Sequence, residues 1–243
     1  MVMDPPGVNL RDMNSTLCRS LTVLGACLAL SASAVNAATI ITDFGATAPT
    51  GNIVASQTTA NGTDQGQRQW RNSGTRRDLG QTFNLTSSTT IDSIYVRVSA
   101  QTSAVGADAS GASVTLTLSN YTNTTDFTPD STVNTFTATL PLTLASSDFI
   151  KFDIDNTFLA AGQYGFQLSF DNPSATNKFV NLALNFDSDG YTSGLQVEST
   201  DGTNFTAGGG TPDLLFYVQG IPEPTSIGLL ALGGLALLAR RRK

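Results

Sequence analysis

Histidine is absent from this chain of 243 residues, and its only two cysteines, Cys18 and Cys27, lie near the amino end. Without histidine, Ser-His-Asp and Cys-His nucleophilic sites are excluded, as are zinc and haem sites that need an imidazole ligand. The rest of the chain also lacks thiolates for metal binding and cysteines for disulfides. A domain of this size can bury enough surface to fold without them.

Positive charge is scarce as well. The formal net charge is −6. Between Ala38 and Ile221 there are seven Lys and Arg residues against 16 Asp and Glu residues, a balance of −9. Nucleic-acid binding needs a basic face, so we expect no nucleic-acid partner. The acidic balance favours solubility and is compatible with calcium.

Long apolar runs occur only at the two ends of the chain. At the amino end, Arg11 and Arg19 precede an apolar run from Leu21 to Leu30, and Val35-Asn36-Ala37 is a small-residue cleavage site. This order predicts a secretory signal peptide over residues 1–37, with export through the Sec translocon and cleavage after Ala37.

Two alternatives concern this amino end. The stretch from Met1 to Asp12 contains two prolines and an acid and suits a signal peptide poorly, so Met13 is a second candidate for the true start. Leu24-Gly25-Ala26-Cys27 resembles a lipobox, which would make the chain a lipoprotein. Against this, the apolar stretch before Cys27 is very short, and the residues after it stay apolar.

The carboxyl end, residues 221–243, has three parts in order. Pro222-Glu223-Pro224 is held extended by its prolines. An apolar run from Ile227 to Ala239 follows; its helix, about residues 226–239, would span roughly 20 Å, short of the roughly 30 Å hydrocarbon core of a bilayer. The final cations are able to snorkel to the headgroups and stay cytoplasmic. These cations are Arg240, Arg241, Arg242 and Lys243.

This tail closely resembles the PEP-CTERM sorting signal of bacterial surface proteins, with Pro222, Glu223, Pro224 and the arginines as the signal residues. The resemblance implies recognition by an exosortase, a membrane-embedded transpeptidase-like enzyme, and removal of the tail. It also implies a Gram-negative type of host that makes exopolysaccharide. The protein would be anchored in the inner membrane during processing and would then reach the envelope or extracellular matrix. The alternative is a plain membrane anchor with a chance Pro-Glu-Pro.

Between the two ends, apolar residues alternate with polar ones at a period of two, and no segment has a helical stripe. We therefore predict an all-β domain over residues 38–220, an antiparallel two-sheet sandwich of jelly-roll type. Residues 46–72 and 101–111 are expected to be long loops. The predicted buried faces comprise Ile94, Val96 and Val98; Val114, Leu116 and Leu118; Ile150, Phe152 and Ile154; Tyr164, Phe166, Leu168 and Phe170; Val180, Leu182, Leu184 and Phe186; and Leu214, Phe216 and Val218.

Trp70 is the only tryptophan, and it lies among Arg71, Arg76 and Arg77 on a polar stretch. An exposed tryptophan ring can stack on a sugar, and arginines can bind carboxylate or sulfate groups. This combination predicts a carbohydrate-binding site, with exopolysaccharide as a candidate partner. The alternative is that Trp70 fills one end of the sandwich while the arginines offset neighbouring acids.

Two pairs of aspartates have a spacing that suits a cation. Asp153 and Asp155 are two residues apart, as are Asp187 and Asp189. Alternate carboxylates in a loop can converge on calcium. Neither pair is followed by the full set of calcium-loop ligands, so the alternative is that these aspartates form turns. We expect no other cofactor.

An enzyme is the third hypothesis. Glycosidases need only two carboxylates, and Glu198 is the only glutamate before the tail, but nothing in the sequence pairs it with a particular aspartate. We therefore expect an exported, non-enzymatic surface or matrix protein. A carbohydrate-binding module is the first alternative and a polysaccharide-active enzyme the second.

Overall fold

The described part of the chain is built entirely of β-strands. The computed structural model describes residues 41–58, 67–73, 75–122, 127–172, 177–186, 191–207 and 212–221, which all belong to the unit Ala37–Lys243. In chain order the strands are β1 (Ile41–Asp43), β2 (Ile53–Gln57), β3 (Gln67–Ser73), β4 (Thr75–Leu85), β5 (Thr89–Arg97), β6 (Ser113–Tyr121), β7 (Ser131–Thr139), β8 (Phe149–Leu159), β9 (Gly162–Phe170), β10 (Phe179–Asn185), β11 (Gln196–Ser199), β12 (Thr206–Ala207), β13 (Asp213–Leu214) and β14 (Phe216–Gly220).

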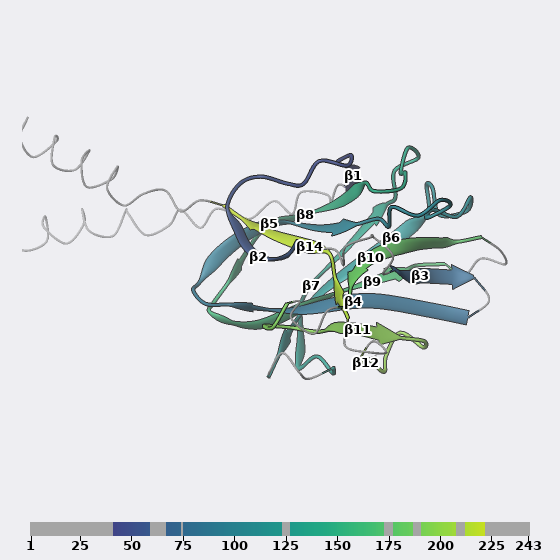
Figure 1. Ribbon diagram of the computed structural model, residues 1–243. Coiled ribbons are helices and arrows are strands. Elements are labelled where there is room, and N and C mark those ends of the chain that lie inside the picture. The colour runs from purple at the N-terminus through teal and green to yellow at the C-terminus, as the bar shows by residue number, and fades with distance from the viewer. Residues whose placement is uncertain are drawn as a thin grey trace, which may run out of the picture. The chain divides into compact units, whose positions relative to one another are not determined.

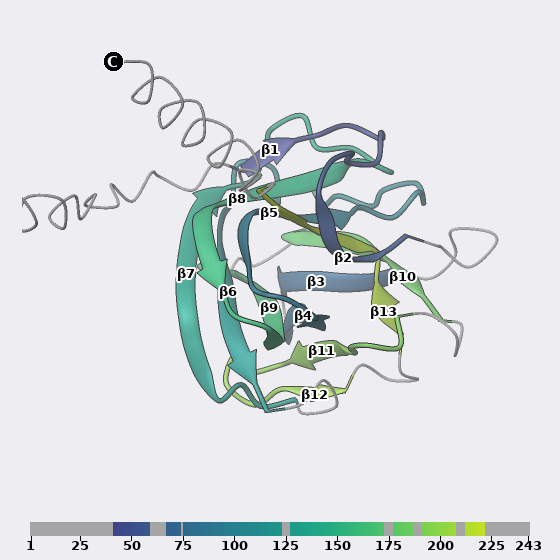
Figure 2. The same ribbon diagram turned by 90° about the vertical axis from the view of Figure 1, so that its left-hand side faces the viewer.

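These strands form two sheets that lie one over the other (Figures 1 and 2). The first is five-stranded, in the order β1-β8-β5-β14-β2. The second is nine-stranded and follows the path β13-β10-β3-β4-β9-β6-β7, with β11 pairing with β4 and β12. Sequence neighbours often lie in different sheets: β4 and β5, joined by a short turn, belong to the second and the first sheet respectively. The predicted antiparallel two-sheet sandwich is confirmed. Its jelly-roll path remains a prediction.

Both sheets contribute alternate apolar side chains to one core. Phe216 on β14 of the first sheet lies with its ring centroid 6.4 Å from that of Phe83 on β4 and 5.8 Å from that of Phe166 on β9. All three side chains are fully buried. Because successive side chains of a strand point to opposite faces, the period-two pattern places each apolar set on the inner face of its sheet.

Two expectations about this pattern are wrong. Residues 46–72, predicted as a long loop, contain β2 and β3. Polar residues dominate β3, so no apolar alternation marks it, and its strand conformation depends on pairing with β4 and β10. Phe186, predicted on a buried face, lies just beyond the end of β10 and is 44% exposed.

A bulge interrupts β8 at Asp155 and Asn156. Both residues have positive φ, 54° and 49°, and the pairing of β8 with β5 shifts register between Ile91 and Ser93. Asp and Asn tolerate this left-handed conformation better than most residues. Backbone geometry therefore explains why two polar residues follow each other here and break the alternation of β8.

Several predictions lie outside the described residues. They are the signal peptide with Ala37, the tail from Pro222 onward, and the pair Asp187 and Asp189. No helix in the described ranges has the length and apolar character of a membrane span.

Candidate functional site

The point where the sandwich meets the predicted sorting signal is formed by β14. This strand lies between β5 and the edge strand β2, and it is hydrogen-bonded on both sides. Its end is held on both sides, because the Gly220 amide donates to the Asn52 carbonyl and the Ile221 amide donates to the Thr90 carbonyl, each at 2.8 Å. Pro222 is the next residue in the sequence. The chain therefore reaches the signal directly from a core strand, with no linker.

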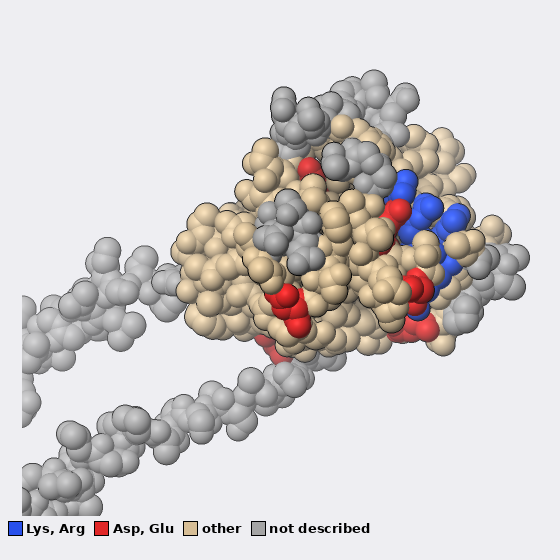
Figure 3. All heavy atoms as spheres, turned by 90° about the horizontal axis from the view of Figure 1, so that it is seen from below, with Lys and Arg blue, Asp and Glu red and all other residues tan. Residues whose placement is uncertain are grey.

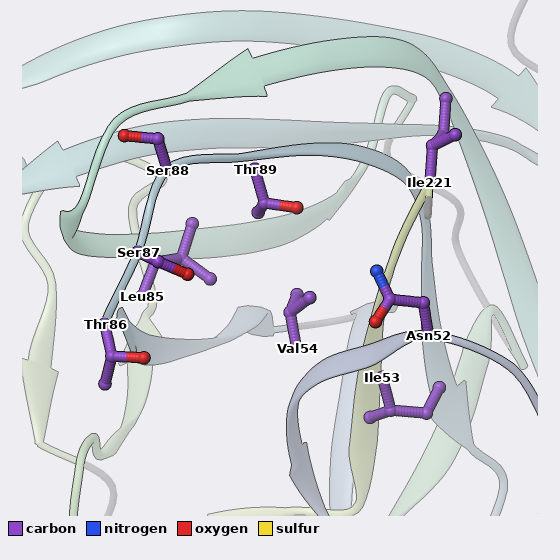
Figure 4. A pocket seen from close by; sticks show the side chains of 9 residues that line it. All are labelled: Asn52, Ile53, Val54, Leu85, Thr86, Ser87, Ser88, Thr89 and Ile221. Carbon is purple, nitrogen blue, oxygen red and sulfur yellow. The ribbon is translucent and has the colours of Figure 1, made fainter. Parts of the chain in front are cut away.

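A pocket of about 360 Å³ opens beside this junction (Figure 4). Asn52 and Ile221 stand on one side of it, and the β4–β5 turn, Thr86 to Ser88, stands on the other (Figure 4). The rim carries hydroxyl and amide groups and none of the lining side chains is ionisable. The complete lining consists of Asn52, Ile53, Val54, Leu85, Thr86, Ser87, Ser88, Thr89 and Ile221.

Gly220 is packed closely against the wall of this pocket. A Cβ at this position would lie 3.0 Å from Thr89 Oγ1 and 3.1 Å from Val54 Cγ1, with Asn52 Nδ2 at 3.2 Å. These contacts are tighter than ordinary van der Waals separations, so a side chain here would displace the lining. The glycine thus allows β14 to end in close contact with β2 and the β4–β5 turn.

Trp70 is a core residue. Its side chain is fully buried, and its ring stacks on that of Phe170 with centroids 4.4 Å apart and an angle of 24° between the planes. A buried ring has no free face for a sugar, so the predicted stacking platform is wrong at this residue. The structure agrees with the alternative in which Trp70 fills the sandwich.

The neighbouring arginines share few acids. Arg68 on β3 binds Glu198 on β11 through two parallel hydrogen bonds of 2.7 Å. The Nε atom of Arg77 lies 3.9 Å from the same carboxylate. Arg71 pairs directly with Arg77 across β3 and β4, and it donates to Gln69 Oε1 at 2.9 Å. Arg68 and Arg77 thus share the carboxylate of Glu198, and Arg71 lies beside Arg77.

The cluster formed by Arg68, Arg71 and Arg77 carries an excess of positive charge. Burial lowers the pKa of Arg77, and the neighbouring charges of Arg68 and Arg71 lower it further, while Glu198 opposes them. Figure 3 shows Lys and Arg gathered in one patch of the face seen from below, with acidic residues around it. A carboxylate or sulfate ligand would relieve the repulsion between these guanidinium groups.

Arg76 has a different, structural role. It donates to the buried carboxylate of Asp78 at 2.8 Å, and this hydrogen bond raises the pKa of Arg76. Burial raises the pKa of Asp78 despite that ion pair. A Cβ at Gly202 would lie 2.4 Å from Arg76 Nη2, so the turn after β11 covers this guanidinium closely. Of the four residues predicted to bind glycans, Arg71 and Arg77 alone remain suited to a ligand.

The predicted calcium ligands that the structure describes are Asp153 and Asp155 on β8. Asp153 lies 3.7 Å from Lys151 Nζ, and Asp155 is in the bulge. The described residues contain no group of three or more His, Cys, Asp or Glu side chains placed to hold a metal ion. Calcium at this pair stays a prediction.

The junction pocket was not found by sequence reasoning. The run Thr86-Ser87-Ser88 is visible in the sequence, but it has the composition of an ordinary turn. Its position beside Ile221 depends on β5 pairing with β14, residues more than a hundred positions away in the chain. Only the folded arrangement of strands brings this turn to the sorting signal.

Comparison with known protein families confirms the predicted sorting motif at the carboxyl end. Residues 220–243 match the family model of the PEP-CTERM protein-sorting motif. No curated protein and no solved structure matches the chain. The match begins at Gly220, the last residue of β14, so motif and core strand are contiguous. The motif implies processing by an exosortase-type enzyme and sorting to the cell surface. The chain therefore carries a PEP-CTERM protein-sorting motif that directly follows the last strand of a β-sandwich.

Proposed function

We propose that this chain is an exported, non-enzymatic protein that an exosortase-type enzyme delivers to the envelope or exopolysaccharide matrix of a Gram-negative type of bacterium. The sandwich is the part that is displayed. The tail acts as a sorting signal, and the enzyme removes it when the protein is transferred to its destination. The acidic balance of the sandwich suits a protein that stays soluble outside the membrane.

The observation that carries this proposal is the position of the motif. The motif follows a strand that is hydrogen-bonded on both sides up to Ile221. Cleavage after this point leaves every described strand, and the whole described core, in the retained part. Removal of the tail therefore leaves the packing among the described residues in place.

A non-enzymatic role is supported by the environment of Glu198. Both of its carboxylate oxygens accept hydrogen bonds from Arg68, and its side chain is only 16% exposed. A general acid or nucleophile needs an accessible carboxyl group with a second carboxyl group nearby. Glu198 instead joins β11 to β3 as part of the structure.

The test is intact mass and terminal sequencing of the protein recovered from its native host. We expect a chain that begins at Ala38 and ends near Pro222. Replacing Glu223 with alanine, or Arg240, Arg241 and Arg242 together, should leave the full tail in place. A wild-type chain that still ends in Lys243 would refute processing, and unchanged processing of these variants would refute the role of the signal residues.

A second function, binding of an acidic polysaccharide, is favoured by the arginine cluster. Arg71 and Arg77 lie opposite each other on paired strands, and both side chains are partly exposed. Paired guanidinium groups match carboxylate and sulfate geometry. The ligand class we propose is therefore an anionic glycan bound through charge, with no aromatic stacking.

This second function is tested with Arg71→Ala combined with Arg77→Ala. Binding to a uronic-acid or sulfated polysaccharide should fall about tenfold or more in the double variant. A control that combines Arg97→Ala with Lys151→Ala removes the same charge from the other sheet and should bind like the wild type. Equal losses in both variants would indicate nonspecific attraction and would refute the site.

A further inference from the structure

We infer that the pocket beside Ile221 is a docking surface for the membrane-embedded processing enzyme, which places a neutral side chain in it while reading the sorting signal. This inference rests on the proposed function, since it concerns the same processing step. It adds that the enzyme recognises part of the folded sandwich as well as the linear tail.

The first argument is distance. From Ile221 to the apolar run that begins at Ile227 there are five residues, which span at most about 17 Å when fully extended. Two backbone hydrogen bonds hold Gly220 and Ile221 in the sheet, so these residues do not add to the length of the connection. An enzyme bound to Pro222-Glu223-Pro224 must therefore lie against the end of the sandwich that carries the pocket.

The second argument is continuity. Ile221 is the residue before the Pro-Glu-Pro tripeptide, and its side chain is also part of the pocket wall (Figure 4). Asn52 accepts a backbone hydrogen bond from Gly220 and contributes its side chain to the same wall. The Pro-Glu-Pro tripeptide that the enzyme recognises therefore directly follows a residue of the pocket wall. One contact surface on the enzyme can cover both.

The third argument is chemistry. The domain as a whole carries a large excess of acids, yet the pocket is lined by hydroxyl, amide and aliphatic groups. Thr86, Ser87 and Ser88 are exposed at the rim, whereas Leu85 is buried at the base. Such a surface accepts a neutral group and excludes a charged one, because an unpaired charge loses its hydration there.

The experiment places negative charge on the rim of the pocket in the full chain, expressed in the native host. Thr86→Glu combined with Ser88→Glu alters two exposed turn positions, where substitutions usually have little effect on stability. The control combines Thr137→Glu with Thr139→Glu, exposed positions on β7; Thr139 pairs with Ser113 at the opposite end of the sandwich. The rate of tail removal is measured by pulse-chase labelling, and the product is identified by its intact mass.

We expect tail removal to be about tenfold slower in the rim variant and unchanged in the control. A second variant, with eight Gly and Ser residues inserted between Ile221 and Pro222, leaves the fold intact and separates pocket from signal; it should also be processed more slowly. Wild-type rates in both the rim and the linker variants would overturn the docking surface and leave sorting intact. A wild-type chain that keeps its tail would refute the sorting proposal itself.

Discussion

Replacing Phe216 with alanine should lower the free energy of unfolding by about 4 kcal/mol. Phe216 lies on β14, an interior strand of the five-stranded sheet, and its side chain is fully buried. Its ring centroid lies 6.4, 5.8 and 5.3 Å from those of Phe83, Phe166 and Tyr191. Deleting the ring removes its burial and leaves a cavity. Two of these three aromatic neighbours, Phe83 and Phe166, lie on the paired strands β4 and β9, so the surroundings cannot move far enough to fill that cavity.

The assay is urea unfolding of residues 38–221, followed by the fluorescence of Trp70, which is the only tryptophan and is fully buried. With a denaturant slope of about 2 kcal/mol per molar, the midpoint should fall by about 2 M. Phe216→Leu keeps most of the volume and should cost about 1.5 kcal/mol at most. A midpoint shift below about 0.5 M for Phe216→Ala would refute the claim that the strand leading into the sorting signal is a core element.

Three further predictions concern other parts of the sandwich. The Asp201 carboxylate accepts backbone hydrogen bonds in its turn, which hold its pKa far below the ordinary 3.8. The unfolded chain therefore binds this proton more readily, and the stability from Asp201 is present above about pH 4 and lost below it, so the difference in urea midpoint between wild type and Asp201→Asn should shrink from about pH 5 to about pH 2. Glu198→Gln should cost about 1–2 kcal/mol by weakening the bond to Arg68, again measured by urea midpoint; an unchanged midpoint would contradict the structural role. Gly80→Ala should cost about 1–3 kcal/mol, because its Cβ would lie 2.3 Å from the carbonyl oxygen of Phe166; thermal unfolding checks this, and an unchanged Tm would contradict the close strand approach.

The sorting signal and the fold class can both be predicted from the amino-acid sequence alone. The signal can be predicted because a linear motif is defined by the type and order of its residues, and both are visible without knowledge of the fold. The all-β sandwich could be read because period two in apolar residues, as in Val114, Leu116 and Leu118, reports directly which side chains share a face. Both are local properties of the chain.

Contacts between residues far apart in the chain become visible only in the folded protein. Arg68 and Glu198 are 130 positions apart, and nothing in their local sequence indicates the ion pair that joins them. Trp70 lies in a polar strand that looks like a loop, and its burial follows from strand pairing that places it on Phe170. The pocket beside the signal likewise arises from the pairing of β14 with β5 and β2. Period two assigns side chains to faces, but long-range packing chooses which strands become neighbours, so the sites formed between strands appear only in the folded protein.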